Sequence, residues 1–600
     1  MGRLIHLLRA AMPIVGWIAV VKIIDGMPVI EAVTPVRSLR PSEVVELLVA
    51  HAEQYLGPYL ALAACAGGSP RCSELGEYIE RGIRTIAEHR CRGREDFERC
   101  VEEEMARLRS LGYYDLWVEL RKIVEPVPSF LFIGPPGIGK SESVMEAARR
   151  IAEKFGLNFV DVAKLERTMY ASMSEHTSER LRTFLFVDLR LTSVEPADLM
   201  GIPRLVGEKY SDYVPFAWAK MLAAGPGMLF LDEFTNVRRE DVMSAAYQLV
   251  LDRKAGFTYF DPGVIIVAAG NSPEHSKIAR KLPTPLHERF KVFNVIPPTI
   301  EDWRRYMERR YGDAWAKSVL MMIISLEAEG QGWVATKGLP PTALGPDEQY
   351  PNPRAWTRLA RELYLLYLPL ARARNTTVDD IVIGALEYAF FMGSCLAARN
   401  IVEPRSEEER LAKMVCEEIA SNVGSRTATT VSLVMGVPLV FERDGKLVGT
   451  IDAILEGMSV DEAIERTVSY LRRKADEIES RIAGMAISEE MRNAIRALLD
   501  ELRNPEECRK WVLRKMAIVM HERLERIIVE RGKEAVKRLA PLLARIVDEL
   551  YEAFGGEGWI LPFVSTMFAP ICRRKWIDIK LEVRKYSRHL DELLEKAMAG

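Results

Sequence analysis

Amide side chains are scarce in this 600-residue sequence, which contains only 4 glutamines and 10 asparagines. Asparagine and glutamine are thermolabile, and the proteins of hyperthermophiles tend to contain few of them. The scarcity therefore predicts a thermostable, thermophile protein. An excess of one charge is also lacking: 82 Lys and Arg stand against 85 Asp and Glu. The net charge of −3 argues against a dedicated nucleic-acid or membrane-surface protein.

Long apolar runs are missing as well. The longest one near the N-terminus, Ala10 to Val21, lies between Arg9 and Lys22 and is too short to span a bilayer. Because no small-residue cleavage site follows it, we favour a β-hairpin turning at Asp25–Gly26 over a signal peptide. We expect a cytoplasmic protein that does not enter a membrane.

Cysteine is too rare for a disulfide scaffold, since the chain has 8 cysteines and none forms a C-x-x-C pair. Four of them, Cys65, Cys72, Cys91 and Cys100, lie close together in the sequence with His89 nearby. Their spacings of 7, 19 and 9 fit no zinc pattern. Buried thiols are the simplest interpretation, one or two disulfides the second, and a metal site the third.

Composition and periodicity divide the chain into four parts. Residues 1–125 hold the hairpin and charged helices, the first opening near Ser42, and end near the proline-flanked "EPVPS". Residues 126–299 alternate short apolar runs with helical periodicity. Residues 300–435 are helical around a Gly/Pro-rich loop at 330–353. Residues 436–600 open with a second hairpin, "PLVFERDGKLVGTID", and continue as long amphipathic helices.

The second part predicts an α/β fold in which helices cover a parallel sheet. Strands alternating with helices are typical of that class, and buried parallel strands are apolar along their whole length. The expected strands are Ser129–Ile133, Thr183–Asp188, Met228–Leu231, Val264–Ala268 and Val292–Ile296.

The stretch "GPPGIGKS" follows the first expected strand and precedes a helix that runs to Phe155. In the pattern G-x-x-x-x-G-K-S, glycines let backbone N–H groups turn toward a phosphate chain, Lys140 reaches its outer phosphates and Ser141 can ligate Mg²⁺. The helix N-terminus adds positive dipole. The expected nucleotide contacts are Gly134, Pro135, Pro136, Gly137, Ile138, Gly139, Lys140, Ser141 and Glu142.

Polar side chains end the third and fourth expected strands. "MLFLDEF" places Asp232 where a carboxylate can hold Mg²⁺, and Glu233 where it can activate a water aimed at the γ-phosphate. "IIVAAGN" places Asn271 where its amide can orient the same water, although such an Asn is usually a turn former. A carboxylate pair at this distance from a phosphate loop predicts hydrolysis.

Two arginines are candidates for contacting the transition state. Arg289, in "KLPTPLHERF", lies just before the fifth strand, and an arginine donated in trans is worth about 10³ to 10⁵ in rate for such enzymes. In "PNPRAW", Asn352 as N-cap and Pro353 at the first helical position would hold Arg354 in the first turn. Taken singly, both arginines would more often be surface ion-pair partners.

In this order the motifs resemble those of AAA+ ATPases and, within that superfamily, the dynein-related, MoxR-like branch. "GPPGIGKS" is similar to Walker A, "MLFLDEF" to Walker B, "AAGN" to sensor 1, "LPTPLHERF" to the arginine-finger box and "NPRAW" to sensor 2. "DLRLTSVEPADLMGIPR" and "AAYQLVLDRKAGF" are typical of the branch. Over 129–435, the resemblance implies a P-loop NTPase core with a five-stranded parallel sheet and a helical lid.

The resemblance also implies a role for each site residue. Lys140 and Ser141 would bind the phosphates of ATP and Mg²⁺, Asp232 would hold Mg²⁺ and Glu233 would activate the water. Asn271 would sense the γ-phosphate, while Arg289 would reach into the site of the next subunit and Arg354 would couple the lid to the nucleotide. A site shared between subunits implies a homo-oligomeric ring, a hexamer by resemblance.

The favoured function is chaperone-like remodelling of a protein partner, which in this branch often carries a von Willebrand factor type A domain. The alternatives are a nucleic-acid motor or restriction-type ATPase, supported by the basic, aromatic stretch "CRRKWIDIKLEVRKYSR", and a nucleotide-gated scaffold with low turnover. A GTPase is disfavoured because the chain lacks N-K-x-D, and an ABC ATPase because it lacks an "LSGGQ"-like signature. Function specific to this protein is expected in the extra segment 158–182 and in the flanking regions.

Overall fold

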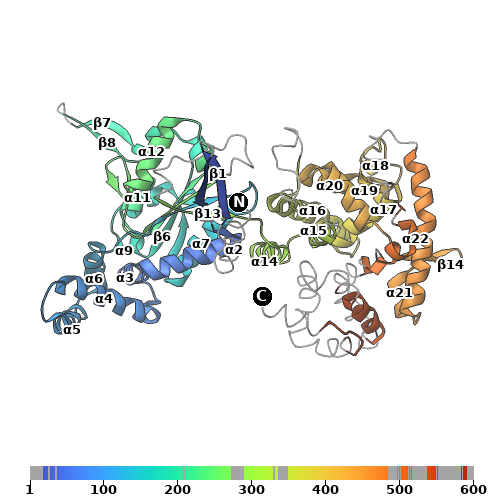
Figure 1. Cartoon of the computed structure of the whole chain (residues 1–600), viewed down its shortest axis with the longest axis horizontal. Coiled ribbons are helices and arrows are strands. Elements are labelled where there is room, and N and C mark those ends of the chain that lie inside the picture. Colours follow the sequence, from blue (N-terminus) through green and yellow to red (C-terminus); the bar gives the residue numbers. More distant parts are fainter. Residues whose placement is uncertain are drawn as a thin grey trace. The chain divides into compact units, whose positions relative to one another are not determined.

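The computed structural model describes residues 18–24, 27–33, 37–206, 210–271, 289–328, 332–334, 349–392 and 394–483, and short segments between 496 and 590. The chain divides into two compact units, Met1–Pro298 and Thr299–Gly600, and each is described by itself (Figure 1). Among the described helices, none is long and apolar enough to cross a membrane.

A seven-stranded sheet forms the centre of the first unit, with the strand order β3-β13-β4-β12-β9-β6-β5 and parallel pairing throughout. All five expected strands are present, but the prediction of a five-stranded sheet was too small, because a strand is added at each edge. The sheet consists of β3 (Ser38–Leu39), β13 (Phe290–Val295), β4 (Ser129–Ile133), β12 (Val264–Gly270), β9 (Gly227–Asp232), β6 (Thr183–Arg190) and β5 (Asn158–Asp161).

Helices bury both faces of this sheet. Alternate residues of each strand point to opposite faces, so Phe130 and Phe132 of β4 lie in one apolar core while Leu131 lies in the other. The first core is closed by α2 (Pro41–His51), which is the helix expected near Ser42, and α7 (Lys140–Lys154). The second is closed by α11 (Ala217–Ala223) and α12 (Glu240–Leu251). Burial on both faces explains why the central strands are almost continuously apolar.

The extra segment 158–182 is part of the sheet and of its border. It forms the edge strand β5, short helical turns and the helices α8 (Tyr170–Met173) and α9 (Ser178–Leu181). Its Arg180 is fully buried and donates to the carbonyl oxygens of Met221, Thr183 and Pro226 at 2.8–3.0 Å. Burial lowers the pKa of Arg180 to about 10, which still leaves the guanidinium charged at neutral pH.

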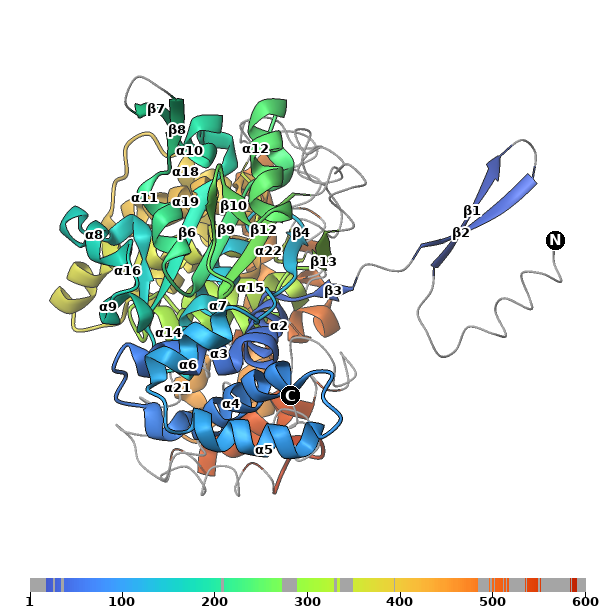
Figure 2. The same cartoon turned by 90° about the vertical axis from the view of Figure 1, so that its left-hand side faces the viewer.

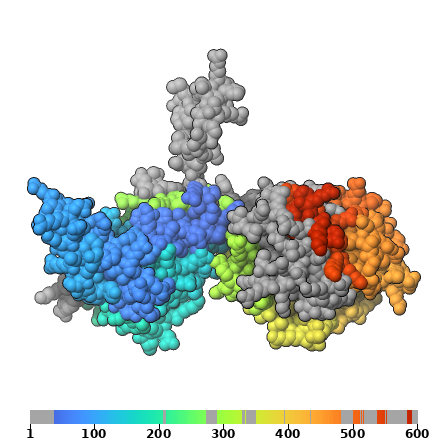
Figure 3. Space-filling view, turned by 90° about the horizontal axis from the view of Figure 1, so that it is seen from below, coloured from blue at the N-terminus to red at the C-terminus, as the bar shows by residue number. Residues whose placement is uncertain are grey.

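A group of helices at one end of the sheet, which we call the appendage, consists of α3 (Gly57–Ala66), α4 (Gly76–Cys91), α5 (Phe97–Leu108) and α6 (Tyr113–Arg121) (Figure 2). Its apolar side chains belong to the same core as α2 and α7. Figure 3 shows the appendage in blue at the surface of the first unit. The hairpin expected at the N-terminus is present as β1 (Ile18–Ile24) and β2 (Met27–Val33), while its turn lies outside the described residues.

A buried carboxylate joins the appendage to the sheet. The side chain of Asp261, which precedes β12, is fully buried and accepts hydrogen bonds from the Tyr59 hydroxyl at 2.6 and 2.8 Å and from the backbone N–H of Gly263 at 2.9 Å. Arg121 of α6 pairs with it at 2.9 Å. Buried ion pairs persist only when their remaining polar atoms are also satisfied, as they are here. Burial and the Asp261 charge hold the pKa of Tyr59 well above its usual range, so the hydroxyl stays a donor.

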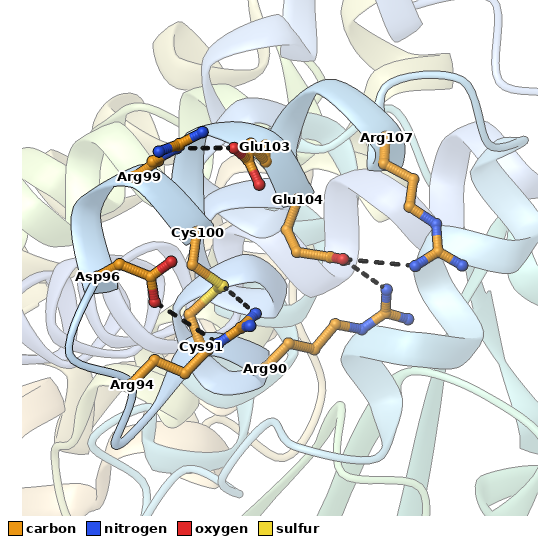
Figure 4. Close-up of a disulfide and its surroundings, with 9 residues drawn as sticks. All are labelled: Arg90, Cys91, Arg94, Asp96, Arg99, Cys100, Glu103, Glu104 and Arg107. Carbon is orange, nitrogen blue, oxygen red and sulfur yellow. Dashed lines mark hydrogen bonds and ion pairs between the residues drawn. A yellow bond between two sulfur atoms is a disulfide. The ribbon is translucent and has the colours of Figure 1, made fainter.

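Among the described residues, six cysteines form disulfides, which corrects the preferred interpretation of Cys65, Cys72, Cys91 and Cys100 as buried thiols. Cys65 pairs with Cys72 and Cys91 with Cys100 inside the appendage. A third pair, Cys395–Cys416, lies in the second unit and was not expected. Figure 4 shows the Cys91–Cys100 bond between α4 and α5, surrounded by ion pairs such as that of Arg90 with Glu104. The described residues contain no cluster of His, Cys, Asp or Glu that could hold a metal ion, so the zinc alternative gains no support.

Reduction of the disulfides is expected to lower thermal stability. Each bond should contribute about 2–4 kcal/mol, chiefly by restricting the unfolded chain. Thermal melts with and without a strong dithiol reductant, with thiol titration to verify reduction, measure the effect. A Cys395→Ser/Cys416→Ser variant distinguishes the stability contributed by the disulfide of the second unit from that contributed by the two disulfides of the appendage. An unchanged melting temperature in fully reduced protein would contradict the prediction, and a melting temperature typical of mesophile proteins would overturn the expectation of thermophily.

The second unit is helical, as expected for residues 300–435, and has one large apolar core. The predicted second hairpin is confirmed as β14 (Val440–Arg443) and β15 (Lys446–Gly449). Most of the Gly/Pro-rich loop at 330–353 and of the basic stretch near the C-terminus lies outside the described residues. The helices are α14 (Ile300–Tyr311), α15 (Ser318–Ala328), α16 (Pro353–Ala373), α17 (Val378–Met392), α18 (Cys395–Arg399), α19 (Glu407–Val423), α20 (Ser425–Met435), α21 (Thr450–Leu455) and α22 (Val460–Ala483).

Candidate functional site

The phosphate loop, residues 134–141, connects the end of β4 to the start of α7. Gly137 and Gly139 have φ values of 78° and 101°, a region that residues with a Cβ rarely adopt. Gly134 donates its N–H to the carbonyl of Gly270, and a Cβ on Gly134 would lie 2.3 Å from the carbonyl oxygen of Val295. The glycines therefore hold the loop tightly against the ends of the two neighbouring strands.

Lys140 and Ser141 begin α7 and point toward the other site residues. The buried ammonium of Lys140 donates to the carbonyls of Gly134 and Pro135 at 2.8 and 2.7 Å, and to the Asn271 side chain at 3.1 Å. The Ser141 hydroxyl donates to the Asp232 carboxylate at 3.0 Å. Three adjacent strands, β4, β12 and β9, thus bring the predicted residues together at their carboxyl ends.

Of the other expected contacts, Pro135 and Pro136 lie in the loop, Ile138 is buried, and Glu142 is exposed in the first turn of α7.

The Walker B turn, residues 232–236, carries both predicted carboxylates. Glu233 has a φ of 59°, and its N–H donates to the Asp232 carboxylate at 2.8 Å. The side-chain amide of Asn236 donates to the Glu233 carboxylate. The left-handed backbone at Glu233 turns its side chain out of line with the strand, and Asn236 then fixes its direction. Asn236 was not among the predicted site residues, although an amide three residues after a strand-end carboxylate was a signal in the sequence.

Asn271 ends β12, and its backbone is held by a residue from the Walker B turn. The Thr235 hydroxyl accepts from the Asn271 N–H and donates to the Asn271 carbonyl, both at 2.8 Å. Asn271 is 9% exposed, and Thr235 only 2%. The Asn271 side chain is thereby directed at Lys140, which is the position expected of a group that contacts the outer phosphate.

A further carboxylate, Asp188, lies at the end of β6 beside the Walker B strand. Although Asp188 is exposed at the rim, partial desolvation and the negative charge of Asp232 raise its pKa to about 6, against the opposing effect of Arg190. The sequence signal, an aspartate near the end of the second expected strand in "FVDLR", was present but unused. Asp188 and Asp232 thus repel each other on neighbouring strands, and the positive charge of Arg190, which lies opposite Asp232, offsets part of that repulsion.

Neither of the two predicted arginines belongs to the segments that form this cluster. Arg289 is exposed and immediately precedes β13, at the amino end of that strand. Arg354 is exposed in the first turn of α16 in the second unit. The N-terminus of α16 is capped as expected. The Asn352 side chain accepts a hydrogen bond from the Ala355 N–H at 3.0 Å, and Pro353 occupies the first turn. The roles of both arginines in catalysis stay predictions.

Two small hairpins of the first unit expose apolar side chains, and we call them the apolar hairpins. They are β7–β8 (Ile202–Val206, Tyr210–Val214) and β10–β11 (Lys254–Ala255, Thr258–Tyr259). The rings of Tyr213 and Phe257 lie 5.8 Å apart and join the two hairpins. In Figure 1 the first hairpin projects from the edge of the unit. The exposed residues, 40–73% accessible, are Ile202, Leu205, Tyr213, Val214, Phe257 and Tyr259.

Comparison with known proteins identifies the segment that carries this site. Residues 130–298 match the family model described as AAA, ATPase family associated with various cellular activities. Among solved structures, NtrX from Brucella abortus in complex with ADP is 15% identical, with 68% of this chain and 73% of that chain covered and a TM-score of 0.23. A second NtrX structure from the same organism is 14% identical, with coverages of 68% and 74% and a TM-score of 0.21. No curated protein matches the chain.

Proposed function

We propose that this chain, whose residues 130–298 form an AAA ATPase family domain, binds ATP with Mg²⁺ and hydrolyses it to remodel a protein partner. One observation carries the proposal. Lys140, Ser141, Asp232, Glu233 and Asn271 converge at the carboxyl ends of three adjacent strands through direct hydrogen bonds. Ligands of open parallel sheets bind at that edge.

The residues present suit a magnesium nucleotide. The Ser141 hydroxyl and the Asp232 carboxylate place two hard oxygen ligands side by side, and Mg²⁺ commonly takes one or two protein oxygens together with phosphate and water. Such an ion, when bound, neutralises charge that develops on the transferred phosphoryl group. Lys140 binds the outer phosphates, and the loop N–H groups hold the rest of the chain.

Glu233 is the group that activates water. Its carboxylate leaves the strand end in the direction fixed by Asn236, while Asp232 is engaged by Ser141. The two carboxylates thus have separate roles, one toward the cation and one toward the attacking water. Asn271, held at its backbone by Thr235, orients the same water and contacts the γ-phosphate.

The exposed side chains of the apolar hairpins support the proposal that ATP hydrolysis acts on a protein partner. A contiguous exposed apolar patch is a common mark of a protein–protein contact. The β10–β11 hairpin follows α12, which begins four residues after the Walker B turn, so the patch is linked along the chain to the site of hydrolysis. We further propose that the active assembly is a ring, a hexamer as in similar proteins, whose Arg289 completes the neighbouring site.

Stimulation by unfolded protein tests this function. ATP turnover in Mg²⁺ should rise several-fold with a permanently unfolded polypeptide such as casein, and Glu233→Gln should be inactive as the background control. Phe257→Ser and Leu205→Ser should lower the ratio of stimulated to basal turnover, because each removes exposed apolar surface that such a contact would bury. Leu447→Ser is the matched control, since Leu447 is 61% exposed on the β14–β15 hairpin of the second unit.

The outcomes separate the alternatives. Stimulation by DNA or RNA but not by polypeptide would favour the nucleic-acid motor. Turnover that stays near the Glu233→Gln background with every additive would favour the nucleotide-gated scaffold. An equal loss of stimulation in Leu447→Ser and Phe257→Ser would remove the apolar hairpins from the proposal.

A further inference from the structure

Thr235 connects two functional groups that belong to different strands. It lies in the Walker B turn after β9, whereas Asn271 ends the neighbouring strand β12. One hydroxyl satisfies both main-chain polar groups of Asn271, accepting from its N–H and donating to its carbonyl, each at 2.8 Å. Because Thr235 is only 2% exposed, water has little access to replace these hydrogen bonds.

The backbone beside Asn271 is shaped to admit this hydroxyl. A Cβ on Gly270 would lie 2.4 Å from the Thr235 hydroxyl oxygen and 2.6 Å from its methyl carbon. Only glycine therefore allows the end of β12 to approach Thr235 so closely. Gly270 also receives the N–H of Gly134, so the same short segment touches the phosphate loop.

The contacts form a continuous chain from the Walker B turn to the phosphate site. The Thr235 hydroxyl holds the Asn271 backbone, the Asn271 side chain accepts from the Lys140 ammonium at 3.1 Å, and Lys140 binds the loop carbonyls. The turn that carries Glu233 is thus tied to the amide that faces the outer phosphate.

We propose that Thr235 is a positioning residue for hydrolysis, whose hydroxyl sets the distance between the Glu233 turn and Asn271. The inference rests on the proposed function. Catalytic groups must be held within about 0.5 Å of their productive geometry, and a displacement of about 1 Å can cost about 10²-fold in rate. A clamp at the Asn271 backbone supplies this restraint without contacting ATP.

Two substitutions isolate the hydroxyl. Thr235→Val keeps the shape but leaves the Asn271 N–H and carbonyl unpaired, whereas Thr235→Ser keeps the hydroxyl and loses only a methyl group. Thr235→Val should lower kcat by about 10- to 100-fold, with ATP affinity and KM within about threefold of wild type, because the phosphate loop is untouched. Thr235→Ser should retain most of kcat. Thr235→Ala replaces the valine variant if that variant does not fold.

A double-mutant cycle distinguishes positioning from a general structural role. If Thr235 acts through Asn271, then adding Thr235→Val to Asn271→Ala should lower kcat by less than about twofold beyond Asn271→Ala alone. Full additivity, or a serine variant as impaired as the valine variant, would overturn the inference. So would a wild-type kcat in Thr235→Val. Absence of ATP hydrolysis in the wild-type protein is a different result, since it removes the proposed function itself.

Discussion

Replacing Arg289 with alanine is expected to lower ATP turnover by about 10³- to 10⁵-fold while leaving the nucleotide site of each subunit intact. Phe290, the next residue, pairs with Ser129, the first residue of β4, whereas the phosphate loop follows Ile133 at the other end of that strand. At about 3.3 Å per residue, Arg289 is separated from the loop of its own chain by roughly 13 Å of strand. This separation is why we expect Arg289 to act on the site of a neighbouring subunit and not on its own.

Mixing two inactive variants tests the shared site directly. Lys140→Ala should lose tight nucleotide binding, because the ammonium that reaches the outer phosphates is gone. After subunit exchange with Arg289→Ala, roughly a quarter of wild-type turnover should return, since random assembly pairs an intact loop with an intact arginine at about one interface in four. Arg92→Ala, an exposed arginine of the appendage, is the control and should behave as wild type. Mixed rings without recovered turnover would refute the shared site.

Asp261→Asn is expected to destabilise the first unit by about 3–5 kcal/mol, because it leaves the charge of Arg121 without its buried counter-ion. The substitution keeps the size of the side chain, so no cavity contributes. Tyr59→Phe removes the hydroxyl that donates to both carboxylate oxygens of Asp261 but leaves the ion pair, and should cost less, about 1–2 kcal/mol.

Denaturant unfolding followed by a probe in the first unit measures these changes. Glu46→Ala is the matched control, since the Glu46–Arg150 pair is largely exposed on the Glu46 side and should matter by less than about 1 kcal/mol. If Asp261→Asn is no more destabilising than Glu46→Ala, then the buried carboxylate does not hold the appendage on the sheet.

The sequence predicted the parts of the fold that depend on local pattern. The central strands were recognisable because burial on both faces makes them apolar throughout, and "GPPGIGKS" has a spacing that few other structures use. The edge strands were missed for the opposite reason. β3 has only two residues, and the side chains of β5 are partly exposed, so neither interrupts the surrounding pattern.

The remaining features depend on partners far away in the sequence. Thr235 contacts a residue 36 positions later, and Tyr59 contacts one 202 positions later. The residues next to a threonine in a turn, or next to a tyrosine on a helix, do not indicate which distant residue it will contact. The disulfide pairs were likewise ambiguous, because four cysteines allow three pairings and spacing does not choose among them.

Helix α12 connects the Walker B turn to the β10–β11 hairpin. Its twelve residues span about 18 Å, and the helix joins the turn that holds Glu233 to the hairpin that exposes Phe257. Hydrogen bonds between each N–H and the carbonyl four residues earlier hold such a helix together along its length. Under the proposed function, a shift of the Walker B turn on release of the γ-phosphate would be passed through α12 to the hairpin that carries Phe257.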